Sequence, residues 1–453
     1  MRAGMPWDWV TFPEFLDSLE RTPKAVNLLP FMPLTPLMVW VMGLERAKAG
    51  ALPTDAETAE MCRLFEEALD AGACGFSTQR LLPDSGSDIQ RDYDGTPMVT
   101  DVMHHETCLA FARVLGRRNE GFIQMTLYSD DFERDRLEYE ELAAVSGRPV
   151  LFNNLVMVEG IPEAHRATMA WIDQCHDRGH RVYPQAVTNA SGFTFSLEDD
   201  FNLFDNYEIW RDCMVGTTAE RLAKFSDPEL RKELRQRTDF SGIDSIENAV
   251  VVEPRSAATQ PYQDLTLGEV AANESKHVID VLLDLSVADQ LRTVFFVRGR
   301  NTAPPEYLRE VARYPWTLPG VSDGGAHTKF FTGGTYPTEF VTQCARDNDF
   351  ISLEDAHWKL STFPAMAAGF RDRGFLQVGA PADILVYDLE ALGLQPLELL
   401  HDLPGGDWRR VRRGVGYKTV MVNGQVTLQD DEPVANDNAG RLLRHGVGAE
   451  SGS

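Results

Sequence analysis

The sequence predicts an α/β fold in which parallel strands alternate with helical crossovers, and three observations support this prediction. Short apolar runs repeatedly follow segments whose apolar residues share one helical face. The chain has 453 residues, of which 43% are hydrophobic, enough for a large core. Neither a G-x-G-x-x-G nor a Walker motif occurs, which disfavours a nucleotide-binding doubly wound sheet and leaves a barrel as the main alternative.

The expected elements follow one another in a regular rhythm. Strands are expected at residues 25–32, 74–78, 121–128, 149–157, 181–187, 293–297 and 318–322. Helices are expected at residues 12–19, 54–71, 109–115, 137–145, 164–177 and 353–360. The second of these helices has the clearest signals, because Thr54 and Glu57 form a T-x-x-E capping box and Gly72 ends the helix.

Two regions depart from the alternation. Residues from about 190 to 290 contain charged helical segments, such as 218–225 and 266–271. An insertion of this size either shapes the rim or lid of an active site or only packs against the fold. After the last helix the chain turns to β structure, with a strand at 382–387 and a hairpin at 419–428. The hairpin turns at Asn423-Gly424, a strong two-residue turn signal.

Composition excludes several classes of partner. The 43 Lys and Arg against 69 Asp and Glu give a net charge of −26, which argues against nucleic acid or an anionic membrane surface. No run approaches 18 apolar residues, so no membrane span is expected, and the first residues lack a signal-peptide core. The six cysteines are dispersed without a C-x-x-C pair, as expected of a cytoplasmic protein.

Asp323 is the chief catalytic candidate. It lies in V-S-D-G-G-A-H, residues 321–327, directly after an apolar strand. In a (β/α) barrel the carboxyl ends of the strands line the active site. A carboxylate there can bind a metal ion and take a proton from the attacking water. The tetrapeptide S-D-G-G alone is more typical of a plain turn, and only its wider surroundings favour a catalytic role.

The surroundings of Asp323 resemble one enzyme family. The ordered segments are residues 7–9 (W-D-W), 72–78 (G-A-C-G-F-S-T), 321–327, 361–365 (S-T-F-P-A), 371–374 (R-D-R-G), 379–388 (G-A-P-A-D-I-L-V-Y-D) and 422–424 (V-N-G). This series resembles the N-acyl-D-amino-acid deacylase branch of the amidohydrolase superfamily. The likeness runs from about residue 6 to residue 445.

The resemblance implies a metal-dependent (β/α)8 barrel of the TIM type with a small β-sandwich. Residues 1–370 are then expected to form the barrel with its insertion, 371–445 the sandwich portion, and 446–453 a loose tail. Asp323 is implied as metal ligand and general acid/base. His327 is expected near the substrate carboxylate, and Tyr183 matches a family tyrosine on the seventh strand that helps hold substrate. Lys329 is a further candidate for orienting substrate.

One departure from the family concerns the first strands. The family's first strand carries a His-x-His metal pair, and no H-x-H occurs in this chain. The tandem His104-His105 does not substitute, because adjacent side chains diverge. Strands three to eight are recognised, whereas strands one and two are absent from this chain. A truncation, a misplaced start codon, a degraded gene or a separately supplied partner each accounts for that absence.

A second departure concerns the middle strands. Where the family has histidines after strands five and six, this chain has Gln124 in Q-M-T-L-Y-S and the pair Asn153-Asn154. Amide groups bind zinc poorly. We therefore expect one zinc or other divalent ion at most, held by the missing first-strand histidines and Asp323. The three amide side chains either bind a substrate amide or satisfy nearby loops.

The working hypothesis is a hydrolase of linear amide bonds, with an N-acyl amino acid or a related amide as its small-molecule partner. One alternative is a catalytically silent truncated paralogue or partner subunit. Another is a small-amide binding protein without turnover, suggested by the asparagines at the expected ligand positions. Unpaired strand edges favour association, as a homo-oligomer or with a complementing subunit.

Overall fold

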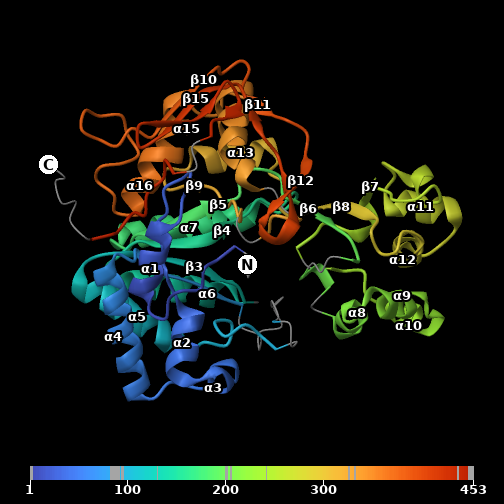
Figure 1. The fold of residues 1–453 in the computed structure, drawn as a ribbon, viewed down its shortest axis with the longest axis horizontal. Coiled ribbons are helices and arrows are strands. Elements are labelled where there is room, and N and C mark those ends of the chain that lie inside the picture. Colours follow the sequence, from blue (N-terminus) through green and yellow to red (C-terminus); the bar gives the residue numbers. More distant parts are fainter. Residues whose placement is uncertain are drawn as a thin grey trace.

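The computed structural model describes residues 4–81, 92, 96–129, 131–198, 202–204, 207–240, 242–324, 327–330, 333–435 and 438–446. These residues form a parallel sheet with surrounding helices, an insertion that projects to one side, and a β region near the C-terminus (Figure 1).

The central sheet consists of parallel strands that follow one another in space as they do in the sequence. Its order is β1 (Met32–Pro33), β2 (Gly75–Arg80), β3 (Phe122–Leu127), β4 (Val150–Leu155), β5 (Val182–Ala186) and β9 (Leu318–Pro319). Every neighbouring pair is parallel. The order never reverses, as it would at the switch point of a doubly wound sheet, so the arrangement is that of a barrel wall.

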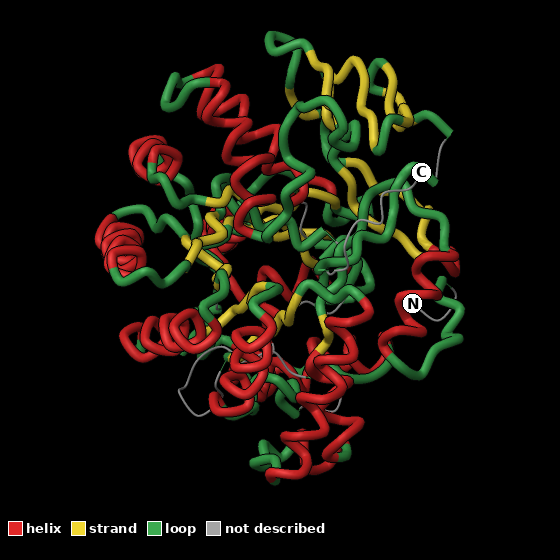
Figure 2. Tube along the Cα trace, turned by 90° about the vertical axis from the view of Figure 1, so that its left-hand side faces the viewer, coloured by secondary structure: helices red, strands yellow, loops and turns green. Residues whose placement is uncertain are grey.

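Helices cover one face of this sheet. They are α2 (Leu34–Met42), α4 (Asp55–Ala71), α5 (His105–Arg118), α6 (Phe132–Ser146) and α7 (Pro162–Asp177). Figure 2 shows helices in an arc outside the strands. The rings of Phe65, Phe76 and Phe111 meet between α4, β2 and α5, with centroids 5.4 to 6.0 Å apart. The largest hydrophobic core of the molecule lies in this layer.

The ends of α4 are those that the sequence predicts. The Glu57 carboxylate accepts a hydrogen bond from the Thr54 backbone N–H at 2.8 Å, and the Glu57 N–H donates to Thr54 Oγ1 at 3.2 Å. Gly72 ends the helix in the left-handed region, at φ 112°. A Cβ atom there would lie 2.5 Å from the Cβ of Arg444, so glycine also makes room for the C-terminal segment.

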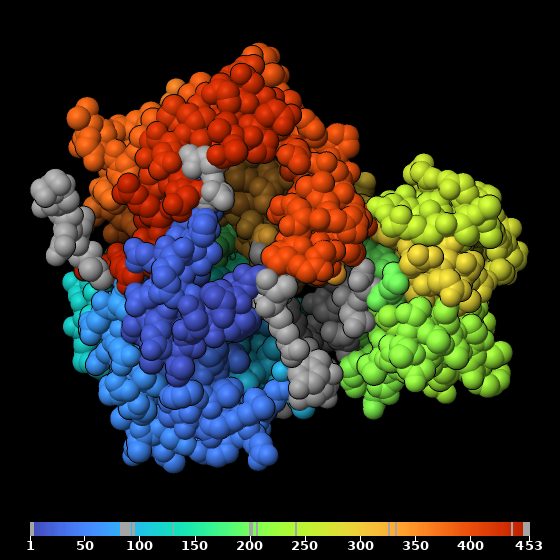
Figure 3. All heavy atoms as spheres, viewed as in Figure 1, coloured from blue at the N-terminus to red at the C-terminus, as the bar shows by residue number. Residues whose placement is uncertain are grey.

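The insertion has its own core and its own sheet. Its antiparallel strands are ordered β6 (Gly192–Phe195), β8 (Val294–Arg298) and β7 (Val250–Glu253). Its helices are α8 (Glu208–Met214), α9 (Thr218–Ser226), α10 (Pro228–Leu234), α11 (Leu267–Glu274) and α12 (Val278–Ala288). The expectation that residues 293–297 resume the barrel was wrong, because β8 is the central strand of this separate sheet. Figure 3 shows the insertion projecting from the rest of the molecule.

The remaining helices surround the last barrel strand and the N-terminal segment. They are α1 (Phe12–Arg21), α3 (Leu44–Lys48), α13 (Pro305–Arg313), α14 (Tyr336–Phe340), α15 (Leu353–His357) and α16 (Phe363–Ala367), with π-helical turns at Val341–Asp347 and Trp358–Thr362. None of the helices in the described ranges is long and apolar enough to cross a membrane. The cytoplasmic location expected from the sequence stays a prediction.

The C-terminal region is antiparallel, as predicted. One sheet has the order β10 (Ile384–Tyr387), β15 (Tyr417–Val422), β16 (Gln425–Gln429) and β17 (Glu432–Pro433). Two further pairs are β11 (Gly393–Leu394) with β14 (Gly414–Val415), and β12 (Glu398–Leu403) with β13 (Asp407–Val411). The β15–β16 hairpin turns at Asn423 and Gly424, both with positive φ, which confirms the turn expected from Asn-Gly.

The two ends of the chain meet. The Leu28 N–H donates to the Arg441 carbonyl at 2.9 Å, and the Leu443 N–H donates to the Leu28 carbonyl at 2.7 Å. Asn27 Oδ1 also accepts from Asn423 Nδ2 at 2.7 Å. Residues 447–453 of the expected tail lie outside the described residues.

Candidate functional site

The face of the sheet opposite the helices carries polar side chains in two layers. Strand register places Gln79, Thr126, Asn153 and Gln185 at one level near the carboxyl ends of β2 to β5. We call these four residues the mouth layer. The level below, toward the amino ends, holds Ser77, Gln124, Leu151 and Tyr183.

Amide and hydroxyl groups connect these two layers. Gln124 Nε2 donates to Gln185 Oε1 at 3.1 Å, and Gln124 Oε1 accepts from Ser77 Oγ at 2.5 Å. Asn153 Nδ2 donates to Thr126 Oγ1 at 3.2 Å, whereas Asn153 Oδ1 is buried and has no partner among the described residues. A buried acceptor without a donor costs free energy unless a ligand or water supplies one. The mouth layer is therefore suited to bind an N–H group.

Asp101 adds a buried carboxyl group beside the mouth layer, and sequence reasoning missed it. Its Oδ1 accepts from the Leu81 N–H at 2.9 Å and from Gln79 Nε2 at 3.5 Å. Burial raises the pKa of Asp101 to about 6, and Oδ2 has no partner among the described residues. The only signal in the sequence is an acid in the otherwise uncharged stretch from Val99 to Met103. A buried acid with a raised pKa at a strand end is typical of functional sites.

Asp323 lies just beyond β9, and its side chain is exposed. Its backbone adopts a positive φ of 45°, and the His327 N–H donates to the Asp323 carbonyl at 3.2 Å. The His327 ring packs against Phe330, with centroids 4.7 Å apart. Between them, residues 325 and 326 lie outside the described ranges. The structure thus joins Asp323 and His327 by a backbone hydrogen bond shortly after the last barrel strand.

The other predicted substrate residues lie elsewhere. Tyr183 packs against the rings of His176, Trp316 and Phe363 at the amino end of β5, away from the mouth layer, and burial raises its pKa. Lys329 forms an ion pair with Asp407 at 3.0 Å. Asn154 is exposed, next to a register irregularity that separates it from the mouth layer. The structure therefore brings together Gln124 and Asn153, but leaves Tyr183, Asn154 and Lys329 out of this cluster.

The described residues do not fit a zinc ion. No group of three or more His, Cys, Asp or Glu side chains comes together in the described part of the chain. The mouth layer offers amides and a hydroxyl, which are poor zinc ligands. His105 instead faces Glu138 and Glu141, and His104 Nε2 lies 2.9 Å from the Gly50 carbonyl oxygen. We derive no chemical step through a metal from these residues.

Comparisons with known proteins identify relatives across almost the whole chain. A profile of the amidohydrolase family matches residues 44–428. D-aminoacylase of Alcaligenes xylosoxydans xylosoxydans is 27% identical over 449 residues, which cover 97% of this chain and 75% of the relative. N-acyl-D-aspartate deacylase of the same organism is 44% identical, but over only 75 residues, 17% of this chain and 14% of the relative.

Solved structures share the fold. A crystal structure of D-aminoacylase aligns with a TM-score of 0.58 at 18% identity, covering 96% of this chain and 75% of that one. N-acyl-D-glutamate deacylase of Bordetella bronchiseptica, solved with zinc and a phosphonate inhibitor, aligns with a TM-score of 0.56, also at 18% identity and with the same coverage. D-aminoacylase has a binuclear metal centre, described as activated by one metal and attenuated by the second. The expectation of one ion at most in this chain stays a prediction.

Proposed function

Because the chain belongs to the amidohydrolase family, we propose that it hydrolyses the linear amide bond of a small N-acyl amino acid or a related amide. The observation that carries this proposal is the family match over residues 44–428, within which Asp323 follows β9. Relatives named as D-aminoacylase and N-acyl-D-glutamate deacylase support this substrate class. The reaction adds water across the amide and yields a carboxylate and a free amine.

We assign the roles from the chemistry of the side chains. The unpartnered Asn153 Oδ1 accepts the substrate N–H, and Gln185 and Gln124 hold the polar wall beside it. Asp323 takes a proton from the attacking water and delivers it to the leaving nitrogen. His327 lies one turn away from Asp323 and contacts the substrate carboxylate. The described residues do not fit the metal that the family implies, so no step of the reaction is assigned to it.

A second candidate function is binding of a small amide without turnover. The observation that favours it is the mouth layer itself, which presents amide and hydroxyl groups where a zinc enzyme needs imidazole. In this reading Asn153 and Gln185 bind the ligand as above, and Asp323 has no chemical role.

A hydrolysis assay separates the two functions. N-acetyl derivatives of D- and L-amino acids are incubated with the full chain, with and without added zinc, and the released amine is quantified. Asp323→Asn is expected to lower the rate by about 100-fold or more, the usual contribution of a general acid/base. Asp349→Asn is the matched control, since Asp349 is also exposed with a positive φ of 50°. An unchanged rate in Asp323→Asn contradicts the assignment, and binding without release supports the second function.

A further inference from the structure

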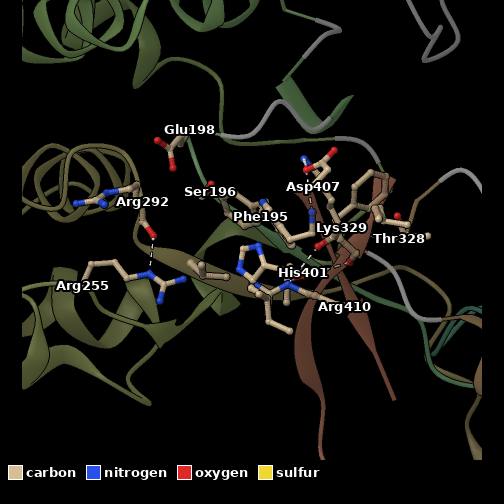
Figure 4. A pocket seen from close by; sticks show the side chains of 16 residues that line it. Phe195, Ser196, Glu198, Arg255, Arg292, Thr328, Lys329, His401, Asp407 and Arg410 are labelled. Carbon is tan, nitrogen blue, oxygen red and sulfur yellow. Dashed lines mark hydrogen bonds and ion pairs between the residues drawn. The ribbon is translucent and has the colours of Figure 1, made fainter. Parts of the chain in front are cut away.

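A cavity of about 760 Å³ lies outside the barrel mouth and plays no part in the proposed function. Its walls come from three parts of the chain: β6 and β8 of the insertion, residues 328–330 after the candidate catalytic turn, and the β12–β13 pair (Figure 4). Cavities of roughly 300–1,000 Å³ are the usual size of small-molecule sites. The volume of the cavity, and its lining by three separate parts of the chain, indicate a second ligand site.

One end of the cavity has excess positive charge. Glu253 accepts from Arg255 Nη2 at 2.6 Å and from Arg410 Nη1 at 2.7 Å, so two guanidinium groups share one carboxylate. Arg410 is fixed in place, because its side chain is 4% exposed and its Nε also donates to the Lys329 carbonyl at 3.1 Å. Arg255 is more exposed, and its Nη1 forms no hydrogen bond with a described residue.

Other charged side chains of the lining do not neutralise the positive charge of Arg255 and Arg410. Lys329 and Asp407 neutralise each other at 3.0 Å. Glu198 lies at the opposite side of the cavity from Arg410 in Figure 4, whereas Arg255 and His401 point toward its middle. In a chain with a net charge of −26, two arginines that share one carboxylate make this end of the cavity locally positive. Guanidinium groups bind carboxylate and phosphate oxygens in a fixed geometry.

Apolar side chains form another part of the lining. The Arg410 guanidinium lies over the Trp408 ring, 5.6 Å from the ring centroid, and the Lys329 ammonium lies 4.9 Å from the same centroid. Phe195, Leu399 and Leu403 complete this wall. Leu399 is 37% exposed, so its side chain is available to a ligand in the cavity. An apolar wall beside paired arginines suits a molecule with an acidic head and an apolar body.

We propose that this cavity binds a small organic anion, whose carboxylate or phosphate group lies between Arg255, Arg410 and His401 and whose apolar body lies against Trp408 and Leu399. The site is separate from the mouth layer and from Asp323, and the proposal goes beyond the proposed hydrolysis.

Calorimetric titration of the full chain tests this site. The probes are phenylacetate, phenyl phosphate and the neutral phenylacetamide. At least one anion is expected to bind saturably at one site, about tenfold or more tighter than phenylacetamide, because only the anions meet the arginines. The tighter anion identifies the acidic group as carboxylate or phosphate. If neither anion binds, or if phenylacetamide binds equally well, the proposal is wrong.

Variants locate the binding. Arg255→Gln and His401→Gln, both at exposed positions, are expected to weaken anion binding by about fivefold or more, a typical loss for a charge-assisted hydrogen bond. Arg409→Gln is the matched control, since Arg409 neighbours Arg410 on β13 but pairs with Asp402 at 2.7 Å and does not line the cavity. Equal losses in Arg255→Gln and Arg409→Gln would mean general attraction to surface charge and overturn the proposal. Asp323→Asn is expected to leave binding unchanged, and loss of binding there would place the anion at the barrel mouth instead.

Discussion

Gln124 on β3 and Gln185 on β5 are joined by a hydrogen bond of 3.1 Å that crosses the intervening strand β4. Both side chains belong to the face of the sheet that the helices leave uncovered. Gln124 donates to Gln185 and accepts from Ser77, so these side chains form a hydrogen-bonded polar wall. Asn153 on β4 keeps one acceptor without a partner among the described residues. The wall and the free acceptor together define where a substrate amide is expected.

Asn153→Ala tests this acceptor. The variant loses one hydrogen bond to substrate, so KM is expected to rise by about tenfold, which corresponds to about 1.4 kcal/mol. Its free energy of unfolding is expected to change by less than about 1 kcal/mol, because the amide is only partly satisfied within the protein. Steady-state kinetics and urea denaturation measure the two quantities. Asn348→Ala, at an exposed asparagine, serves as control, and a fall in kcat alone would argue against a binding role.

The buried carboxyl group of Asp101 makes the free energy of unfolding depend on pH. Its pKa is raised by burial from 3.8 to about 6, so the folded protein holds this proton more tightly than the unfolded chain does. The stabilisation is complete below 3.8 and is lost as the pH rises through about 6. Relative to Asp101→Asn, the parent protein is expected to lose up to about 3 kcal/mol between pH 4 and pH 7.

Urea denaturation of both proteins at several pH values measures this difference. Asp177→Asn, at an exposed aspartate, is the control and is expected to follow the parent curve. A constant difference between the parent and Asp101→Asn across this range would show that Asp101 does not titrate there.

The ion pair between Arg410 and Glu253 ties β13 to β7 of the insertion at 2.7 Å. Removing the buried guanidinium in Arg410→Met leaves Glu253 with Arg255 alone, so we expect a loss of about 2 kcal/mol in the free energy of unfolding. A double-mutant cycle with Glu253→Gln is expected to give a coupling energy of about 1 kcal/mol or more. Additive losses would mean that the Arg410 side chain acts only through its bond to the Lys329 carbonyl.

Asn27 holds three separate segments through its amide. It accepts from Asn423 Nδ2 at 2.7 Å and from the Arg441 N–H at 3.0 Å, and it donates to Asp383 at 3.2 Å. Asn27→Ala is expected to cost about 1–3 kcal/mol and to expose residues 438–446 to proteolysis. The control is Asn248→Ala, at an exposed asparagine with one local bond to Asp244. Unchanged cleavage of the C-terminal segment would contradict this role.

Local signals predicted the barrel wall well. The capping box at Thr54, the left-handed Gly72 and the Asn423-Gly424 turn each depend on neighbouring residues alone, and all three are present. The bounds of the strands from β2 to β5 were predicted within a few residues, because a short apolar run between two helices usually forms a buried strand.

Features that depend on distant partners were not predictable. The apolar run at β8 forms the central strand of its sheet, and a buried barrel strand has the same kind of sequence. Only the antiparallel partners β6 and β7 show that β8 is not part of the barrel. Asp101 has no motif, and its burial depends on a contact with β2 that no local pattern encodes. Tyr183 was placed by resemblance, but its ring is held by Trp316 and Phe363, more than a hundred residues later.

The contact between residues 24–28 and 440–443 has a consequence for how the protein is made. Arg441 bonds to Asn27 across 414 positions of sequence, so the ribosome completes nearly the whole chain before this contact can form. Until then the Leu28 backbone lacks its partners Arg441 and Leu443, whereas β1, a few residues later, can already pair with β2. The segment before β1 is thus expected to be secured last during synthesis, and a nascent chain stalled before residue 440 would leave residues 24–28 open to chaperones.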